Sequence, residues 1–102
     1  MVIISKTYIN SYSINNREIK NALTSWYEIT KNANWKNYHE LKESFNSADS
    51  VGNDRYVFNI KGNQYRLIAL IFFKTRTLFI LFIGNHQEYN KINANKIEYE
   101  KQ

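Results

Sequence analysis

One stretch decides the fold: residues 57–66, with the sequence VFNIKGNQYR. Gly62 and Asn63 stand between two runs in which apolar and polar residues alternate, a strong signal for a β-hairpin. With this pair as the loop, the expected register places Asn59 opposite Arg66. Because side chains alternate across a strand, one face of the hairpin is polar and basic while the other is apolar. The polar face comprises Asn59, Lys61, Gln64 and Arg66, and the apolar face comprises Phe58, Ile60, Tyr65 and Leu67.

The second informative pattern begins as an apolar strand over residues 78–83 and stops at Gly84. Asn85 is a favoured helix N-cap, and Glu88 three residues later fits a capping box. A helix is therefore expected to begin at His86. A short helix here would follow directly from the preceding strand.

These two pieces are expected to meet. His86 and Tyr89 share one face of the predicted helix because they lie three residues apart. If residues 64–73 and 78–83 pair around Thr75 and Arg76, Arg66 lies opposite Asn85. This register brings four side chains into one neighbourhood: Lys61, Arg66, His86 and Tyr89.

The rest of the chain predicts one further strand and several helices. Residues 1–4 are apolar and predict a strand, and Ser5 is a candidate cap for a short helix. Three later helices are each expected to begin with the pattern Asn-x-x-Glu, at Asn15, Asn37 and Asn85. Residues 47–54 are interpreted as a loop, and the polar tail of residues 93–102 as an extension of the last helix. An apolar stripe at helical spacing is formed by Ile19, Leu23, Trp26 and Thr30.

This order of elements predicts an α+β fold. We expect an antiparallel sheet of about four strands, with the N-terminal helices packed on it and a short C-terminal helix. The chain has 102 residues and no proline, repeat or low-complexity linker, so a single domain over residues 1–102 is expected.

Composition limits the possible functions. The net charge of +5 favours an anionic partner. The chain has no cysteine and two histidines, without HxxxH or HxxE spacing, so neither a metal site nor a small-molecule cofactor is expected. The longest apolar run, residues 67–73, is far shorter than the roughly 20 residues that span a membrane. Since no signal peptide is evident, we expect a cytoplasmic protein.

The order VFNIKGNQYRL, apolar strands and FIGNHQEYNKI resembles the HigB branch of the RelE-like toxins. Trp35 and residues 45–49 also fit that pattern, so the resemblance extends from about Trp26 to Ile92. It implies a RelE-like fold and a ribosome-dependent mRNA interferase, a metal-independent endoribonuclease that inhibits translation. It also implies three partners: the ribosome, mRNA and a cognate antitoxin, a HigA-like helix-turn-helix protein.

RNA cleavage without a metal needs proton transfers and stabilisation of charge on the phosphate. His86 is the candidate for proton transfer, and Arg66 can bind a phosphate bidentately. Lys61 would supply a further charge, while Tyr89 could hydrogen-bond the phosphate, transfer a proton or stack on a base. The wider RNA-binding candidates are Trp35, Lys36, Asn59, Lys74 and Arg76.

Each candidate has a structural alternative. His86 could be a surface or capping residue, Arg66 an ion-pair partner of Asp49 or Asp54, Lys61 a solvated side chain, Tyr89 a lid on the core and Trp35 part of the core. Lys74 and Arg76 could serve to protect a strand edge. His39 is interpreted as a surface residue.

Two positions depart from the pattern of the toxins that the chain resembles. Leu81 stands where many relatives carry arginine, and Asn90 stands where aspartate is common. Both changes remove a charge near the expected site and favour a second interpretation, a weakened or non-catalytic toxin that binds RNA or its antitoxin. A third interpretation is a ParE-like inhibitor of gyrase, which shares the fold class.

Overall fold

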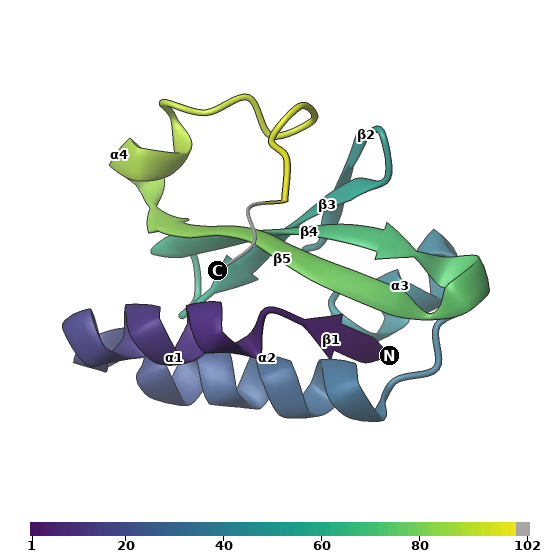
Figure 1. The fold of residues 1–102 in the computed structure, drawn as a ribbon, viewed down its shortest axis with the longest axis horizontal. Helices are drawn as coiled ribbons and strands as arrows, with labels where there is room; N and C mark the ends of the chain where they lie inside the picture. The colour runs from purple at the N-terminus through teal and green to yellow at the C-terminus, as the bar shows by residue number, and fades with distance from the viewer. Residues whose placement is uncertain (100–102) are drawn as a thin grey trace.

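The computed structural model describes residues 1–99, in which helices and strands form an α+β arrangement (Figure 1). The strands are β1 (Val2–Ile4), β2 (Asp49–Gly52), β3 (Arg55–Ile60), β4 (Tyr65–Phe72) and β5 (Thr77–Asn85). The α-helices are α1 (Lys6–Asn15), α2 (Lys20–Asn32), α3 (Tyr38–Ser44) and α4 (His86–Tyr89). Two 3₁₀ turns connect elements, η1 (Arg17–Ile19) and η2 (Phe73–Thr75). The expected α+β class is confirmed.

The sheet differs from the expected one in two details. Its five strands have the order β1-β5-β4-β3-β2, and β1 runs parallel to β5, whereas the other pairs are antiparallel. The extra strand is β2, within residues 47–54 that were expected to be a loop. Positive φ angles at Gly52 (92°), Asn53 (53°) and Asp54 (61°) reverse the chain tightly enough for β2 to pair with β3.

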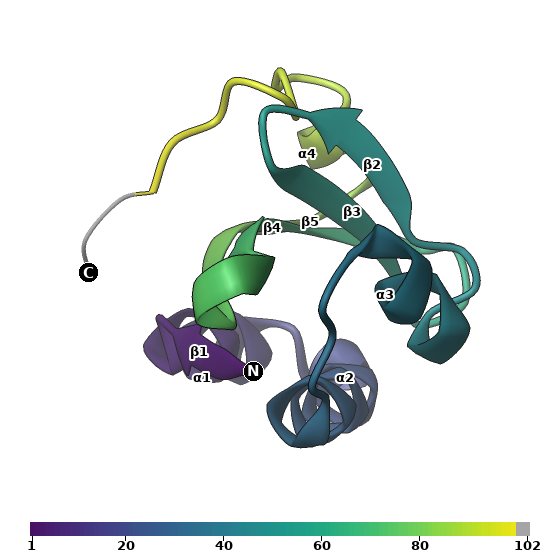
Figure 2. The same ribbon diagram turned by 90° about the vertical axis from the view of Figure 1, so that its right-hand side faces the viewer.

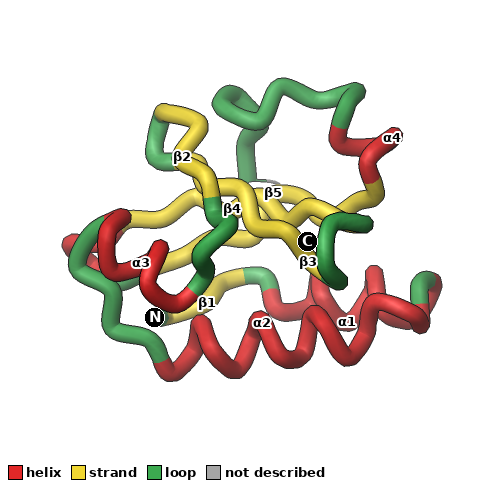
Figure 3. The backbone as a smooth tube through the Cα atoms, turned by 180° about the vertical axis from the view of Figure 1, so that it is seen from behind, coloured by secondary structure: helices red, strands yellow, loops and turns green. Residues whose placement is uncertain are grey.

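The two faces of the sheet are covered differently. Helices α1 and α2 lie side by side beneath one face (Figures 1 and 3), and the predicted stripe on and before α2 is buried there. Aromatic rings fill this core, with Phe58 lying 5.4 Å from Trp26 and 5.2 Å from Phe45 between ring centroids. Helix α4 and the segment after it lie on the other face (Figure 2). That face has its own apolar cluster around Val57, Ile68 and Leu81.

The hairpin at Gly62 has the predicted register, since Asn59 pairs with Arg66. The next register was wrong by one residue, because Arg66 lies opposite Gly84 instead of Asn85. The β4–β5 connection is longer than expected, because Phe72 pairs with Thr77 and residues 73–76 form the connection, which shifts the pairing by two residues. A β-bulge at Leu81 then moves the register by one residue in the opposite direction, so the net difference at Arg66 is one residue.

Two of the three predicted Asn-x-x-Glu caps are confirmed. The Asn37 side chain accepts a hydrogen bond from the Glu40 backbone N–H, and Asn85 with Glu88 forms a full capping box. The cap at Asn15 was wrong, because α1 continues through Asn15 and α2 begins only at Lys20. Ser5 precedes α1 but its side chain makes no capping bond; its hydroxyl donates to Tyr99.

The segment after α4 was expected to continue as a helix and does not. Helix α4 ends at Tyr89, and the chain then crosses the sheet, held by bonds from Arg55 Nη2 to Ile97 O (2.8 Å) and from Asn53 Nδ2 to Asn95 O (2.8 Å). Residues 100–102 of the predicted extension lie outside the described residues. Within residues 1–99, none of the helices has the length and apolar character needed to cross a bilayer.

The packing of α2 on the sheet generates a stability prediction. Leu23 is 0% exposed, so Leu23→Ala should lower the free energy of unfolding by about 2–5 kcal/mol through lost burial and a cavity. Ile29 on the same helix is 44% exposed, and Ile29→Ala should change stability by less than about 0.5 kcal/mol. Urea unfolding of both variants measures the difference. Equal losses would show that α2 does not pack through the Leu23 face.

Candidate active site

The hairpin turn and the start of α4 meet at one backbone oxygen. His86 Nε2 lies 2.5 Å from the carbonyl oxygen of Asn63, and Arg66 Nη1 lies 3.2 Å from the same oxygen. Arg66 Nη1 also donates to the carbonyl of Tyr65 at 3.3 Å. A carbonyl oxygen has two lone pairs and can accept from two donors. The Asn63 carbonyl therefore joins His86 and Arg66 directly.

This contact determines the tautomer of His86. A carbonyl oxygen can only accept a hydrogen bond, so Nε2 must carry a proton. In the neutral imidazole the lone pair then lies on Nδ1. The His86 side chain is exposed, and Nδ1 has no partner among residues 1–99. The exposed imidazole therefore offers Nδ1 as its proton acceptor.

Arg66 and Tyr89 are stacked beside this oxygen. The Arg66 guanidinium carbon lies 5.9 Å from the centroid of the Tyr89 ring, within cation–π range. The Tyr89 ring also packs near Phe82, with centroids 6.5 Å apart, and is partly buried against the second apolar cluster. Within the described chain Arg66 forms no ion pair with Asp49 or Asp54, so that alternative is not supported. Its remaining N–H groups are available to a ligand.

The position of His86 depends on the cap at the end of β5. Asn85 Oδ1 accepts from the Glu88 N–H at 2.9 Å, and Glu88 Oε1 accepts from the Asn85 N–H at 2.9 Å. Gly84 is required just before the cap, since a Cβ there would lie 2.4 Å from the Phe82 ring and 3.0 Å from Glu88 Cβ. Helix α4 thus starts at a fixed point of the sheet.

Sequence reasoning missed a group of tyrosines and carboxylates that supports this cap. Tyr12 on α1 donates its hydroxyl to Glu88 Oε1 at 3.2 Å, and the Tyr65 hydroxyl donates to Glu18. The two rings meet edge to face, 6.4 Å apart. No local pattern indicates these contacts, since Tyr12 and Glu88 lie 76 residues apart.

These contacts shift several pKa values. Burial, reinforced by the negative charge of Glu88, raises the pKa of Tyr12 well above its ordinary value. The hydrogen bond to Glu18 raises the pKa of Tyr65, and the same bond lowers the pKa of Glu18. The neutral phenols are therefore the forms that the folded protein favours.

Lys61 is not joined to the other three candidates by any contact within residues 1–99. Its backbone takes a left-handed conformation (φ 52°), which breaks the alternation that placed its side chain beside Arg66. Its charge acts on Glu18, whose pKa it helps to lower, and Glu18 bonds to Tyr65 from the face opposite Arg66. The structure therefore brings together Arg66, His86 and Tyr89.

The wider RNA-binding candidates fall into two separate groups. Asn59 pairs with Arg66 and lies at the site. Lys74 and Arg76 lie at the other end of β4, which is roughly 23 Å long at about 3.3 Å per residue. Arg76 Nη1 donates to Asn34 at 2.7 Å, which places the α2–α3 connection at that end too.

That connection carries Trp35 and Lys36. Trp35 is 3% exposed and donates from its indole to Ser44, so its ring belongs to the core and is inaccessible to RNA in this structure. Lys36 is exposed, as are Lys74 and Arg76. The exposed cations at this end form a surface separate from the site around His86.

The two residues that depart from the toxin pattern occupy different environments. Leu81 is 6% exposed and packs with Val57 and Ile68, on the same face as Arg66. Asn90 is exposed at the end of α4, where its backbone N–H donates to His86 O. No set of three or more His, Cys, Asp or Glu side chains in residues 1–99 is arranged to hold a metal ion.

Comparison with known proteins places this chain among the toxins. The family model of the HigB toxins, described as the RelE-like toxic component of a toxin-antitoxin system, matches residues 19–92. An mRNA interferase HigB of Escherichia coli O6:H1 is 34% identical over 73 residues, which cover 70% of this chain and 71% of that protein. The chain therefore belongs to the HigB toxin family.

Two further relatives are shorter matches. The mRNA interferase toxin HigB of Escherichia coli K12 is 34% identical over 62 residues, and an mRNA interferase HigB of Shigella flexneri gives the same figures. These alignments cover 59% of this chain and 60% of each relative. The matched family region includes both the hairpin and α4, hence all three residues that meet at the site.

The tyrosine contacts generate a pH prediction. Because folding raises the pKa of Tyr12, its contribution to stability is fully present below the unfolded-state value near 10 and is lost as the pH rises through the folded-state value. Between about pH 9 and about pH 11, the free energy of unfolding should therefore fall more steeply for the wild-type chain than for Tyr12→Phe. Tyr27→Phe is the control, since Tyr27 faces Lys6 Nζ at 4.7 Å instead of a carboxylate. Identical slopes for the wild type and Tyr12→Phe would contradict the assignment.

Proposed function

We propose that this chain is the toxin of a type II toxin-antitoxin system and acts as a ribosome-dependent mRNA interferase in the cytoplasm. One observation carries the proposal: the shared Asn63 carbonyl holds an imidazole and a guanidinium side by side, in a family whose relatives include mRNA interferases. These two groups supply the proton acceptor and the fixed cation that RNA cleavage requires.

The reaction begins at the 2′-hydroxyl of the message. His86 Nδ1 accepts the 2′-hydroxyl proton, because Nε2 is already committed to Asn63. The 2′ oxygen attacks the adjacent phosphorus, and the bond to the 5′ oxygen of the next nucleotide breaks. That oxygen takes up a proton from water as it leaves. The products are a 2′,3′-cyclic phosphate and a new 5′-hydroxyl end.

Arg66 has the electrostatic role. Its Nη1 faces two backbone carbonyls, which hold the guanidinium in place while its other N–H groups remain available to phosphate oxygens. Negative charge that develops on the phosphate during attack is stabilised by this preorganised cation. Tyr89 packs against the guanidinium, so it restricts Arg66 and presents a phenol beside the phosphate. Lys61 contributes a more distant positive charge.

The inventory of acids and bases at the site is small, which suits an enzyme that depends on the ribosome. One imidazole and one phenol give limited proton transfer, so positioning of the message must supply much of the rate enhancement. The ribosome would provide that positioning. The exposed cations Lys36, Lys74 and Arg76 are available for contacts with ribosomal RNA. The third partner is a neutralising antitoxin, a HigA-like helix-turn-helix protein.

A weakened, non-catalytic toxin is the second candidate, and the burial of Leu81 favours it. An arginine at position 81 would lie on the same face as Arg66, but this chain has an apolar residue that packs into the second cluster. Leu81→Arg would therefore bury a charge and cannot be treated as a simple restoration. Such a binder would bind its antitoxin or RNA without cutting.

The decisive experiment is to induce the chain from a tightly repressed promoter and to map new 5′ ends in cellular mRNA. Cuts in frame with codons, together with growth arrest, are expected for the wild type. His86→Ala should reduce cleavage by about 10²–10⁴-fold and Arg66→Ala by about 10²–10³-fold, through loss of proton transfer and of charge stabilisation.

Two exposed residues supply matched controls. His39→Ala changes an exposed histidine on α3, and Lys31→Ala changes an exposed cation on α2, which packs on the face of the sheet away from α4; both should retain cleavage within a few-fold. Arrest with intact mRNA would indicate a toxin that does not cut RNA, and DNA damage signalling would then point to gyrase. Neither arrest nor cuts, with folded protein present, would favour the binder.

A further inference from the structure

Helix α1 lies beside the end of β5 that leads to the candidate site. Strand β1 pairs with β5 only as far as Phe79, and within the described residues no other strand pairs with this side of β5 beyond that point. The chain then continues as α1, which runs along the second half of β5 toward α4 (Figure 1). Helix α1 therefore takes the place of a neighbouring strand along the last residues of β5.

Two tyrosine hydroxyls on α1 make the polar contacts with this part of the chain. The Ile83 backbone N–H donates to the Tyr8 hydroxyl at 3.3 Å. Tyr12 lies one helical turn later on the same face of α1 and donates its hydroxyl to Glu88 Oε1 at 3.2 Å. One face of α1 therefore contacts both the last residues of β5 and the cap of α4.

The Tyr12 contact reaches His86 through one carboxylate oxygen. Glu88 Oε1 also accepts from the Asn85 N–H at 2.9 Å, which is one of the two bonds of the capping box before His86. A helix of four residues is not stable alone, so its start depends on such contacts. Glu88 is exposed, and the bond from Tyr12 restricts its side chain to the position that caps Asn85.

The Tyr12 ring is held independently of its hydroxyl. It meets the Tyr65 ring edge to face with centroids 6.4 Å apart, and the Tyr65 hydroxyl donates to Glu18. Replacement of Tyr12 by phenylalanine therefore keeps the ring contact and removes the bond to Glu88. This makes the hydroxyl testable apart from the packing of the ring.

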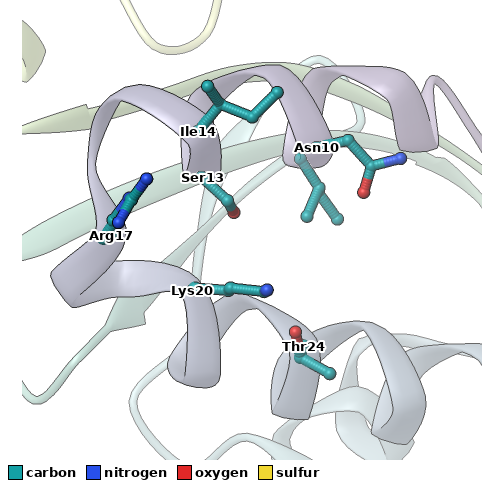
Figure 4. Close-up of a pocket in the computed structure, with 7 residues that line it drawn as sticks. Asn10, Ser13, Ile14, Arg17, Lys20 and Thr24 are labelled. Carbon is teal, nitrogen blue, oxygen red and sulfur yellow. The ribbon is translucent and has the colours of Figure 1, made fainter.

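The side of α1 that faces α2 is less tightly packed. A pocket of about 480 Å³ separates the two helices over part of their length (Figure 4). Its lining includes Asn10, Ser13 and Ile14 from α1 and Lys20 and Thr24 from α2, and neither Tyr8 nor Tyr12 belongs to it. Contact with α2 therefore constrains this part of α1 incompletely, and the tyrosine bonds help to fix α1 against the end of β5.

We propose that Tyr8 and Tyr12 are positioning residues for RNA cleavage: their hydroxyls fix the end of β5 and the Glu88 cap, and thereby hold His86 Nε2 at the Asn63 carbonyl. Neither tyrosine contacts the reacting atoms, since both act through His86. The consequence for cleavage rests on the proposed function, whereas the hold on His86 rests on the contacts alone.

The first measurement is the ¹⁵N NMR spectrum of the imidazole rings in the full chain, at a pH at which both are neutral. The chain has two histidines, and the exposed His39 on α3 is the unconstrained reference. In the wild type, Nε2 of His86 should be the protonated nitrogen, because the Asn63 carbonyl accepts from it. In Tyr8→Phe/Tyr12→Phe, the tautomer populations of His86 should shift toward those of His39, while His39 stays unchanged.

The second measurement is cleavage of a defined message on purified translating ribosomes. It separates the rate constant at saturating toxin from the toxin concentration that gives half the maximal rate. Tyr8→Phe and Tyr12→Phe should each lower the rate constant by roughly three- to tenfold, as expected for one hydrogen bond, and change the half-saturating concentration by less than about twofold. Tyr27→Phe is the matched control, since the Tyr27 ring on α2 faces Lys6 Nζ at 4.7 Å, and it should leave both quantities within about twofold of the wild type.

Two comparisons separate positioning from a general loss of stability. If Tyr12 acts through His86, Tyr12→Phe should not reduce the residual cleavage of His86→Ala any further, whereas a loss of folded protein would reduce cleavage in both backgrounds. Glu88→Gln keeps an oxygen that can accept both bonds, so it should cleave at least about three times faster than Glu88→Ala. Equal rates for these two variants would contradict the proposal, because the hydrogen bonds would then not matter.

Three further results would overturn the proposal. One is wild-type tautomer populations of His86 in the double tyrosine variant, and another is an equal loss of cleavage in the wild-type and His86→Ala backgrounds. The third is a raised half-saturating concentration at an unchanged rate constant, which would assign the tyrosines to a surface that binds RNA or the ribosome. A wild-type chain that does not cut mRNA would refute the proposed function, and the NMR result would still decide whether the tyrosines hold His86.

Discussion

The pairing of β4 with β5 is the constraint on which the rest of the structure depends. These strands lie at the centre of the sheet, with helices on one face and the segment after α4 on the other, so their apolar side chains are covered on both sides. Their register fixes Arg66 opposite Gly84 and therefore determines where α4 begins. The bulge at Leu81 sets this register, because the extra residue displaces everything after it by one position.

The site is built from backbone features more than from a network of side chains. A left-handed turn at Lys61 and Gly62 presents one carbonyl, and a capping box starts a helix of four residues next to it. Neither of these short elements would be rigid alone; the turn is held between β3 and β4, and α4 is held at its start by β5. Loops on a rigid scaffold commonly carry function, since the scaffold fixes positions while the loops supply accessible groups.

Sequence reasoning succeeded where the signal was local. The Gly62 hairpin, the Asn37 and Asn85 caps and the buried stripe of α2 each depend on residues a few positions apart. The parallel pairing of β1 with β5 was not predictable in this way, because it joins segments more than 70 residues apart. The bulge had no signal either, since Leu81 is one apolar residue within an apolar run.

Some failures at the site have the same origin. Lys61 was placed beside Arg66 by strand alternation, but its positive φ ends the strand geometry one residue earlier. The Asn15 cap failed because Glu18 bonds to Tyr65, a distant partner, instead of to the backbone near Asn15. Arg66, His86 and Tyr89 lie together as expected even though the register was off by one. His86 and Tyr89 belong to the same short helix, so a shift of one residue moves both together.

The bond between Tyr12 and Glu88 has a consequence for communication across the sheet. Tyr12 belongs to α1 on one face of the sheet, while Glu88 caps the helix that carries His86 on the other face. This bond connects the two faces of the protein, as does the bond from the Ser5 hydroxyl to Tyr99. If a ligand bound at α1 shifts the α4 cap through this bond, thermodynamic reciprocity requires that a ligand bound near His86 shift α1 by the same free energy.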